Sequence, residues 1–249
     1  MQIDLYHTVA ALRQGSALLT RVVGRRCQAC LNTLPFDEDG LLCRTCAARL
    51  APRSGGYCPQ CGDCYADPAA PVYTCSSCRT NPPQWTELYF YGPYEGELKD
   101  MIHRHKFGCD HGVGSLVTYL ATRLIQLRAP TIPDLVIPVP MGPTRLRQRG
   151  FNQSVELART VARLLACPMR LDALLKLRET APQSSLGRKD RLANLKGVFV
   201  AQTDLSGKHI LLVDDVMTTG ATLAACAKAC RDAGARCLDA FVLARALRA

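Results

Sequence analysis

Four pairs of cysteines, each with the spacing Cys-x2-Cys, constrain the N-terminal part of this chain more than any other feature. The chain has 249 residues and 14 cysteines, nine of which fall between Cys27 and Cys78. A chain of this length can bury a core without disulfide bonds. No apolar stretch approaches the ~18–20 residues of a membrane span, and the N-terminus does not have the pattern of a signal peptide. We therefore expect a cytoplasmic protein whose paired cysteines bind metal.

The spacing predicts two four-sulfur metal sites, because two thiolates in one tight turn can bind an ion and a second turn completes a tetrahedral set. The sequential sets are Cys27, Cys30, Cys43 and Cys46, and Cys58, Cys61, Cys75 and Cys78. A cross-braced arrangement of alternate pairs is the alternative. Zinc is favoured over iron as the commoner structural ion, and complete four-sulfur sites leave no open position for chemistry. We expect two structural Zn²⁺ ions.

The remaining cysteines have no firm role. Cys64 is a spare thiol that could compete as a ligand of the second set. Cys226 and Cys230 lie one helical turn apart, but buried cysteines commonly behave as small hydrophobic residues. The segment HRHKFGCDH (103–111) carries three His and one Cys, for which an exposed polar loop is the preferred interpretation over a metal site.

After Pro82 and Pro83 the pattern changes to strands alternating with helices, which indicates a parallel α/β sheet. Strands are expected at 86–91, 135–139, 209–213 and 238–243, and helices at 116–127, 152–165 and 221–233. The expected domains are an N-terminal helix in residues 1–26, a Cys-rich double zinc ribbon in 27–83 and the α/β domain in 84–249.

The sequence HILLVDDVMTTGATL (209–223) predicts a buried strand followed by a phosphate-binding turn. Ligands of open α/β sheets bind at the carboxyl ends of strands, where Asp214 and Asp215 stand. The turn over residues 218–222 offers N–H groups and hydroxyls to a phosphate, and the following helix N-terminus adds positive potential. Because adjacent carboxylates repel phosphate, we expect them to accept hydrogen bonds from ribose hydroxyls. The combination predicts a ribose-5-phosphate site.

This run resembles the signature of type I phosphoribosyltransferases, which bind phosphoribosyl pyrophosphate (PRPP). The resemblance implies that Asp214 and Asp215 bind the ribose, and that the 5-phosphate is held by Thr218, Thr219, Gly220, Ala221 and Thr222. Purine-type members often carry, at the position of Thr218, an Asp that assists proton transfer to the base, so purine salvage is in doubt. The expected fold is α/β, a type I phosphoribosyltransferase-like parallel sheet with helices on both faces, preceded by the zinc-ribbon module.

Residues 141–191 contain eleven Lys and Arg against four Asp and Glu, which gives most of the net charge of +10. Arg145, Arg147 and Arg149 follow a strand end, and their guanidinium groups suit the pyrophosphate of PRPP, which Mg²⁺ must bridge. The stretch 176–199 is polar in its middle and suggests a lid. Its candidate flexible-loop residues are Lys176, Arg178, Thr180, Gln183 and Arg191. A solvated basic face is the alternative.

Together these motifs make the chain similar to the ComF family, which includes competence proteins and GntX-like proteins. The resemblance rests on the cysteine pairs, KFG (106–108), RLRQRGFNQS (145–154), the spacing of Thr180, Gln183, Arg191 and Asn194, and VDDVMTTGAT (213–222). It implies a cytoplasmic protein that binds PRPP and helps handle single-stranded DNA during natural transformation. Association with the membrane DNA-uptake machinery is a further expectation.

Two other functions are consistent with the same residues. The first is an active phosphoribosyltransferase, in which Mg²⁺ and the arginines would stabilise the leaving pyrophosphate. The second, implied by the GntX-like members, is a role in gluconate uptake or iron–sulfur handling. Motifs for binding persist readily in proteins that have lost turnover, so the sequence leaves catalysis open.

Overall fold

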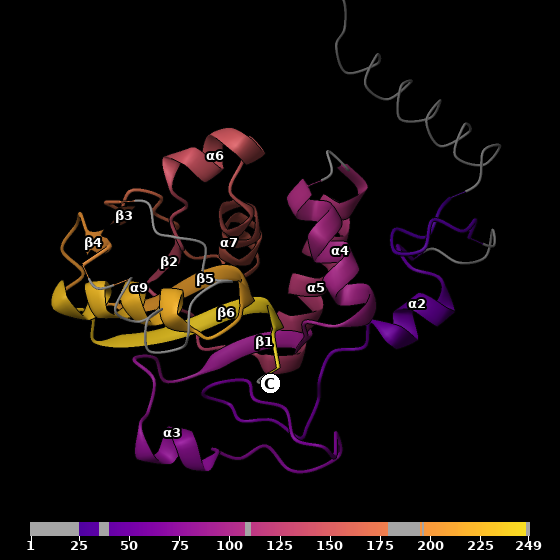
Figure 1. Ribbon diagram of the computed structural model, residues 1–249, viewed down its shortest axis with the longest axis horizontal. Helices are drawn as coiled ribbons and strands as arrows, with labels where there is room; N and C mark the ends of the chain where they lie inside the picture. Colours follow the sequence, from indigo (N-terminus) through magenta and orange to yellow (C-terminus); the bar gives the residue numbers. More distant parts are fainter. Residues whose placement is uncertain (1–24, 35–39, 108–110, 179–194, 196, 248–249) are drawn as a thin grey trace, which may run out of the picture. The chain divides into compact units, whose positions relative to one another are not determined.

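The computed structural model describes residues 25–34, 40–107, 111–178, 195 and 197–247 (Figure 1). The chain divides into two compact units, Met1–Ala51 and Pro52–Ala249. The second unit contains both the second cysteine set and the α/β sheet. The helix expected in the N-terminal 26 residues falls almost wholly outside the described residues. None of the described helices combines the length and hydropathy that a bilayer crossing requires.

The sheet of the second unit has four parallel strands in the order β1 (Leu88–Pro93), β6 (Cys237–Arg245), β5 (His209–Met217) and β2 (Leu135–Pro138). All four strands coincide with apolar runs in the sequence. β5 continues to Met217, beyond the apolar run that ends at Val213, so the acidic pair lies within the strand. Because the strands are parallel, their carboxyl ends meet at one edge.

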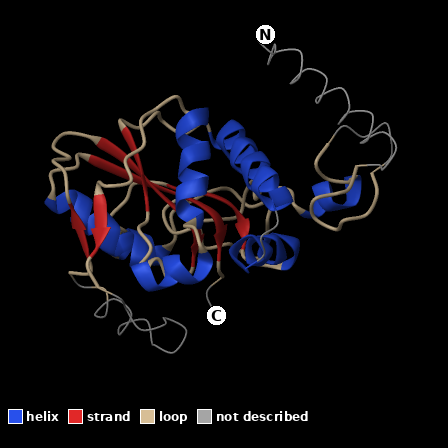
Figure 2. Cartoon of the chain, turned by 90° about the horizontal axis from the view of Figure 1, so that it is seen from above, coloured by secondary structure: helices blue, strands red, loops and turns tan. Residues whose placement is uncertain are grey.

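Helices cover both faces of this sheet (Figure 2). On one face α5 (His111–Arg128) packs on β1, and α7 (Gln153–Leu164) packs on β2, β5 and α5. On the other, alternate residues of β5 and β6 share a core with α9 (Ala221–Asp232). This core includes Ile210 and Leu212 of β5, Leu238 and Ala240 of β6, and Cys226 and Cys230 of α9. This alternation follows the two-residue period of a strand.

Two helices replace segments that we expected to be loops. Residues 103–107, assigned to an exposed loop, belong to α4 (Gly96–Phe107). The arginine-rich stretch after β2 forms α6 (Pro143–Arg149), with Pro143 in its first turn and Gly150 left-handed at its C-terminus. Proline at the start and glycine just past the end are helix signals, which the alternation of arginines obscured.

Smaller elements complete the described residues. α2 (Arg44–Arg49) and α3 (Ser76–Thr80) each begin directly after a cysteine, Cys43 and Cys75. An antiparallel pair, β3 (Leu174–Lys176) and β4 (Phe199–Ala201), flanks the stretch that we expected to form a lid. Most of that stretch lies outside the described residues.

A buried hydrogen bond between a histidine and an aspartate lies at the amino ends of β5 and β6. His209 Nε2 lies 2.8 Å from Asp239 Oδ2, and Asp239 also accepts a hydrogen bond from the Glu87 amide. The Cys237 thiol lies within 4.8 Å of both side chains, a neighbourhood that its spacing in the sequence does not reveal. These residues lie at the opposite end of β5 from its acidic pair.

Replacing His209 by Gln is expected to destabilise the fold without affecting the carboxyl-end site. A hydrogen bond to a charged group contributes about 1.5–3 kcal/mol, so urea unfolding should register a loss of about that size. Unchanged stability would show that the pair is not structural.

Candidate functional site

A cavity of about 280 Å³ opens at the carboxyl ends of β2 and β5. Its walls come from the end of α4, the turn after β2, α6, the start of α7 and the β3–β4 pair. The polar and charged side chains that line it are Lys106, Arg145, Arg149, Asn152, Gln153, Ser154, Lys176, Asp214, Asp215, Thr218 and Thr222. The two carboxylates and part of the predicted phosphate turn therefore share one cavity.

The carboxyl group of Asp214 has a raised pKa. Burial and then the negative charge of Asp215 raise the pKa of Asp214 to about 7. Its Oδ1 accepts hydrogen bonds from Ser154 Oγ at 2.7 Å and from the Asp215 amide at 2.9 Å, which partly offset this rise. Near neutral pH this side chain can switch between a hydrogen-bond donor and an acceptor.

Asp215 instead forms an ion pair with Lys106. Lys106 Nζ lies 2.9 Å from Asp215 Oδ2, and both side chains are mostly buried, with 17% and 15% exposed. Lys106 had no individual role in the sequence-based site, although it begins the KFG motif. The cation faces the cavity from α4 and offsets one of the two adjacent charges.

The predicted phosphate turn has the geometry of an anion site. Gly220 has a φ of +79° and precedes α9 as its N-cap, without a side-chain capping bond. The first N–H groups of a helix have no intrahelical acceptor and can donate to a ligand, although the Ala221 amide here donates to Thr219 Oγ1 at 3.4 Å. A small cavity of about 20 Å³ is lined by Asp214 and by the turn residues Thr218, Gly220, Ala221 and Thr222, but not by Thr219. A Cβ at Gly220 would lie in ordinary van der Waals contact, 3.4 Å from Met217 Sδ and 3.5 Å from the Trp85 ring, so the positive φ and not packing favours glycine here.

The three candidate arginines are separated by the structure. Arg145 and Arg149 line the cavity, whereas Arg147 is exposed on α6 and is not among the lining residues. The cause is helical periodicity, because residues four apart share a face and the residue between them does not. From the sequence alone, the three alternating arginines were assigned the same role.

Gln153 is a further site residue, which belongs to the RLRQRGFNQS motif but had no individual role in the sequence-based site. Its side chain is 1% exposed and lines the cavity, and its Oε1 accepts a hydrogen bond from Arg149 at 3.3 Å. Among the described residues its Nε2 has no hydrogen-bond partner. Because a buried donor without an acceptor is rare, Nε2 is suited to donate to a ligand.

The candidate flexible-loop residues divide in the same way. Lys176, on β3, lines the cavity, and Arg178 is exposed two residues later. Thr180, Gln183 and Arg191 lie outside the described residues.

The cysteines form the two sequential sets. In each set the four Sγ atoms lie within 4.8 Å of one another: Cys27, Cys30, Cys43 and Cys46 in the first, and Cys58, Cys61, Cys75 and Cys78 in the second. Cys64 lies outside both, and its thiol donates to the Gly62 carbonyl at 3.6 Å. Four sulfurs so placed can hold a metal ion.

In each set, backbone amides favour the thiolate form of one cysteine, whereas burial raises the pKa of Cys46, Cys61 and Cys78. The Cys43 amide donates to Cys27 Sγ and the Cys75 amide to Cys58 Sγ, each at 3.4 Å. Although burial opposes it, backbone hydrogen bonds lower the pKa of Cys27 to about 6 and lower that of Cys58 below its usual value. On α9, by contrast, burial raises the pKa of Cys230 to about 12, which fits an inert buried residue.

Comparison with known proteins shows what the chain is similar to. Residues 152–248 match the phosphoribosyl transferase domain. DNA utilization protein YhgH of Salmonella typhimurium is 32% identical over 225 residues, which cover 89% of this chain and 97% of that protein. Competence protein F of Haemophilus influenzae is 30% identical over 231 residues, with the same coverage. A solved structure of glutamine PRPP amidotransferase from B. subtilis is 23% identical, with a TM-score of 0.37 over 52% of this chain and 26% of that one.

The fold and the domain match define a protein with a type I phosphoribosyltransferase-like domain and a cysteine-rich module that can bind metal. The similarity to relatives at about 30% identity covers nearly the whole length of those relatives and most of this chain. The chain belongs to the ComF family.

Proposed function

We propose that the cavity binds PRPP, or another ribose-5-phosphate ligand, together with Mg²⁺. The observation that carries the proposal is that one cavity is lined by both carboxylates, Asp214 and Asp215, and by Thr218 and Thr222 of the phosphate turn at the start of α9. The turn suits a phosphate, and the carboxylates suit hydroxyl groups that donate hydrogen bonds. A ribose 5-phosphate presents both kinds of group at a fixed separation.

Each residue has a role in this proposal. Asp214 and Asp215 accept hydrogen bonds from the ribose hydroxyls. The 5-phosphate is bound by Thr218, Thr219, Gly220, Ala221 and Thr222. Lys106, Arg145 and Arg149 provide positive charge for the pyrophosphate group. Mg²⁺, when bound, neutralises pyrophosphate charge, and the carboxylate and phosphate oxygens are the hard ligands that it prefers.

Calorimetric titration of the purified protein tests the ligand. PRPP with Mg²⁺ should bind more tightly than ribose 5-phosphate, and ribose should not bind. Lys106→Met should weaken PRPP binding about tenfold, since a charge-assisted contact contributes about 1.5–3 kcal/mol. Lys228→Met is the matched control, because Lys228 pairs with Asp232 on the exposed side of α9. No PRPP binding, or equal binding by both variants, would exclude the proposed site. Release of pyrophosphate would identify an active transferase.

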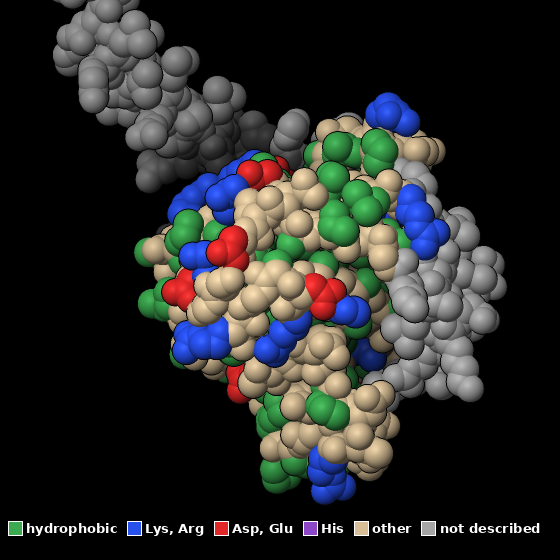
Figure 3. All heavy atoms as spheres, turned by 90° about the vertical axis from the view of Figure 1, so that its left-hand side faces the viewer, with side chains coloured by type: hydrophobic (Ala, Val, Ile, Leu, Met, Phe, Trp, Pro, Cys, Tyr) green, Lys and Arg blue, Asp and Glu red, His purple; other side chains and the backbone are tan. Residues whose placement is uncertain are grey.

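We further propose that the family member handles single-stranded DNA in the cytoplasm and holds two structural Zn²⁺ ions. The DNA part is supported by α6, which carries three arginines and has no buried residue. It is also supported by the names of the relatives, a DNA utilization protein and a competence protein. The zinc part is supported by the two sets of four clustered cysteines. On the face in Figure 3, over β3, β4 and α9, basic and acidic side chains of the described residues are interspersed. That mixture favours α6 over this face as the DNA contact.

Salt dependence of DNA binding tests the role of α6. Each phosphate contact to a single strand contributes about 0.7 to the slope of log affinity against log salt concentration. The double variant Arg145→Gln, Arg147→Gln should therefore reduce the slope by about 1.4 in anisotropy titrations with an oligodeoxynucleotide. Arg170→Gln is the control, since Arg170 is exposed but pairs with Asp172. An unchanged slope in the double variant would remove α6 from the interface.

A further inference from the structure

The turn of the second cysteine set is bonded to the α/β sheet through three successive carbonyl groups. The Pro59 carbonyl accepts from the Leu88 amide at 2.8 Å. The Gln60 carbonyl accepts from Trp85 Nε1, and the Cys61 carbonyl from Arg245 Nε, each at 2.7 Å. Three consecutive acceptors with partners outside the turn leave its backbone little freedom relative to the sheet.

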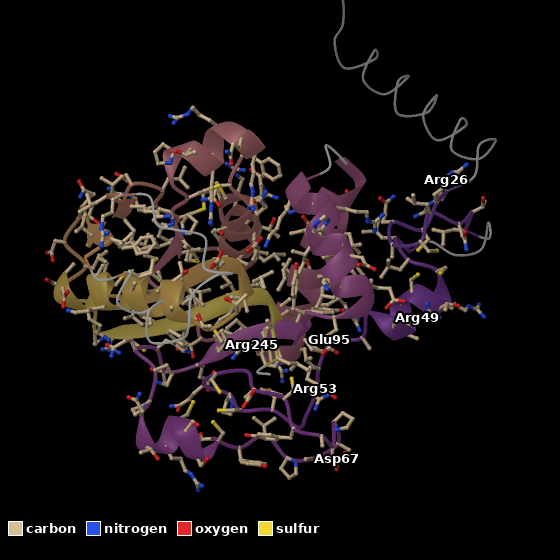
Figure 4. All side chains as sticks on the ribbon, in the orientation of Figure 1. Arg26, Arg49, Arg53, Asp67, Glu95 and Arg245 are labelled. Atoms are coloured by element: carbon tan, nitrogen blue, oxygen red, sulfur yellow. The ribbon has the colours of Figure 1, made fainter. Side chains whose placement is uncertain are left out.

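Arg245 also bonds to the phosphate turn. The side chain is 2% exposed and lies at the end of β6, above the second cysteine set in the view of Figure 4. Its Nη1 donates to the Met217 carbonyl at 3.3 Å and to the Thr218 carbonyl. One guanidinium group therefore bonds to a metal-binding cysteine and to the first residue of the phosphate turn.

Trp85 makes a second connection between the same two segments. Its indole N–H bonds to the cysteine turn, and its ring lies 3.5 Å from the position of a Cβ on Gly220. The side chain is 5% exposed. Gly62 directly follows Cys61 and has a φ of +66°. A Cβ at Gly62 would lie 3.2 Å from Arg245 Cγ. The cysteine turn thus packs directly on the two side chains that support the phosphate turn.

We propose that the metal at the Cys58, Cys61, Cys75 and Cys78 site positions the phosphate turn through Arg245, so that ligand binding at residues 218–222 depends on occupancy of this site. The metal fixes Cys61, and the Cys61 carbonyl fixes one end of the guanidinium. The other end then holds the Met217 and Thr218 carbonyls, which orients the amides that follow. Arg245 is a positioning residue, and the ligand part of the inference rests on the proposed function.

Thermodynamic linkage makes the coupling reciprocal. If metal strengthens PRPP binding, PRPP must strengthen metal binding at the same site by the same factor, typically about 5–150-fold in coupled systems. The first cysteine set belongs to the other compact unit and lacks these connections among the described residues. Its metal should be indifferent to PRPP.

Hydrogen exchange of the full-length, zinc-loaded protein tests the coupling without any ligand. Cys78→Ser should accelerate exchange of amides in residues 216–223, whereas Cys43→Ser, which weakens the first set, should not. Arg245→Met should reproduce the acceleration with both metals bound, and Arg236→Met, an exposed arginine bonded to the Gly207 carbonyl, should not. In the Cys78→Ser, Arg245→Met double variant the two effects should not add, because both interrupt one connection.

PRPP titration with Mg²⁺ gives the second measurement. PRPP affinity should fall at least fivefold in Cys78→Ser and in Arg245→Met, and PRPP should protect one of the two zinc ions from a chelator. If Cys78→Ser proves unfolded, the Arg245→Met exchange data and the chelator experiment decide the matter on folded protein. Exchange of residues 216–223 that is unchanged in Arg245→Met would overturn the inference. Failure of PRPP to bind the wild-type protein would refute the proposed function alone, because the exchange data still decide the coupling.

Discussion

Replacing Asp214 by Asn is expected to make the ligand-free protein more stable and to weaken PRPP binding by at least about 100-fold, because two charge-assisted hydrogen bonds are lost. Both effects come from the same cause. The carboxyl is held where its charge is unfavourable until a ligand arrives, beside Asp215 and with Ser154 as its hydrogen-bond donor. Asparagine keeps the shape of the side chain but carries no charge.

The pH dependence of stability follows from the direction of the pKa shift. The pKa of Asp214 rises from about 3.8 in the unfolded chain to about 7 in the folded one. Folding therefore takes up a proton between these values, and stability falls as the pH rises through that window. One pKa unit corresponds to about 1.4 kcal/mol, so the cost above pH 7 is on the order of 4 kcal/mol. Asp214→Asn should recover much of this cost in urea unfolding at pH 8 and little of it at pH 4.

Ligand binding should have the opposite pH dependence. Ribose hydroxyls donate to the ionised carboxylate, so PRPP affinity should rise between pH 6 and 8, with release of a proton that calorimetry in buffers of different ionisation enthalpy can count. The matched control is Asp172→Asn, since Asp172 is exposed and pairs with Arg170 away from the cavity. Its stability and affinity should vary with pH as in the wild type. A less stable Asp214→Asn protein, or one that binds PRPP normally, would contradict this account of the carboxyl.

The phosphate turn could be predicted from sequence because its determinants are local. The apolar run before Asp214, the glycine at 220 and the helix that begins at Ala221 all lie within one short segment. Even here the strand end was placed too early. The acidic pair belongs to β5 because the backbone pairing with β6 continues, with Asp214 opposite Val242 and Met217 opposite Arg245. An apolar pattern carries no information about such backbone pairing.

Other site residues could not be found in this way because their partners are distant in the chain. Lys106 reaches Asp215 from α4, and its role depends on how α4 packs near the sheet edge. Arg245 is a single arginine at the end of an apolar strand, and nothing in its neighbours indicates a bond to Cys61. Arg147 is the converse case, since the sequence grouped it with Arg145 and Arg149, whereas α6 places it outside the lining of the cavity.

Removing the metal ions is expected to shift the fluorescence emission of Trp85. Trp85 is the single tryptophan of the chain, is buried, and donates its indole N–H to Gln60 in the turn of the second cysteine set. A structural zinc site contributes about 10–16 kcal/mol of apparent binding free energy, whereas whole domains are stable by about 5–15 kcal/mol. Without the ion, the four clustered thiols have no reason to remain together, and the turn that covers the indole should open.

The emission maximum should therefore move to longer wavelength when a strong chelator is added, and zinc should restore it. The two sets can be separated by variants. Cys58→Ser should give the shifted spectrum without chelator, whereas Cys27→Ser, in the other compact unit, should lose one zinc ion by metal analysis and keep the wild-type spectrum. An unshifted spectrum in a protein stripped of both ions would mean that the turn is held by its three carbonyl bonds alone. In that case the metal would not control the surroundings of Trp85, and its ring would support Gly220 whether or not the site is filled.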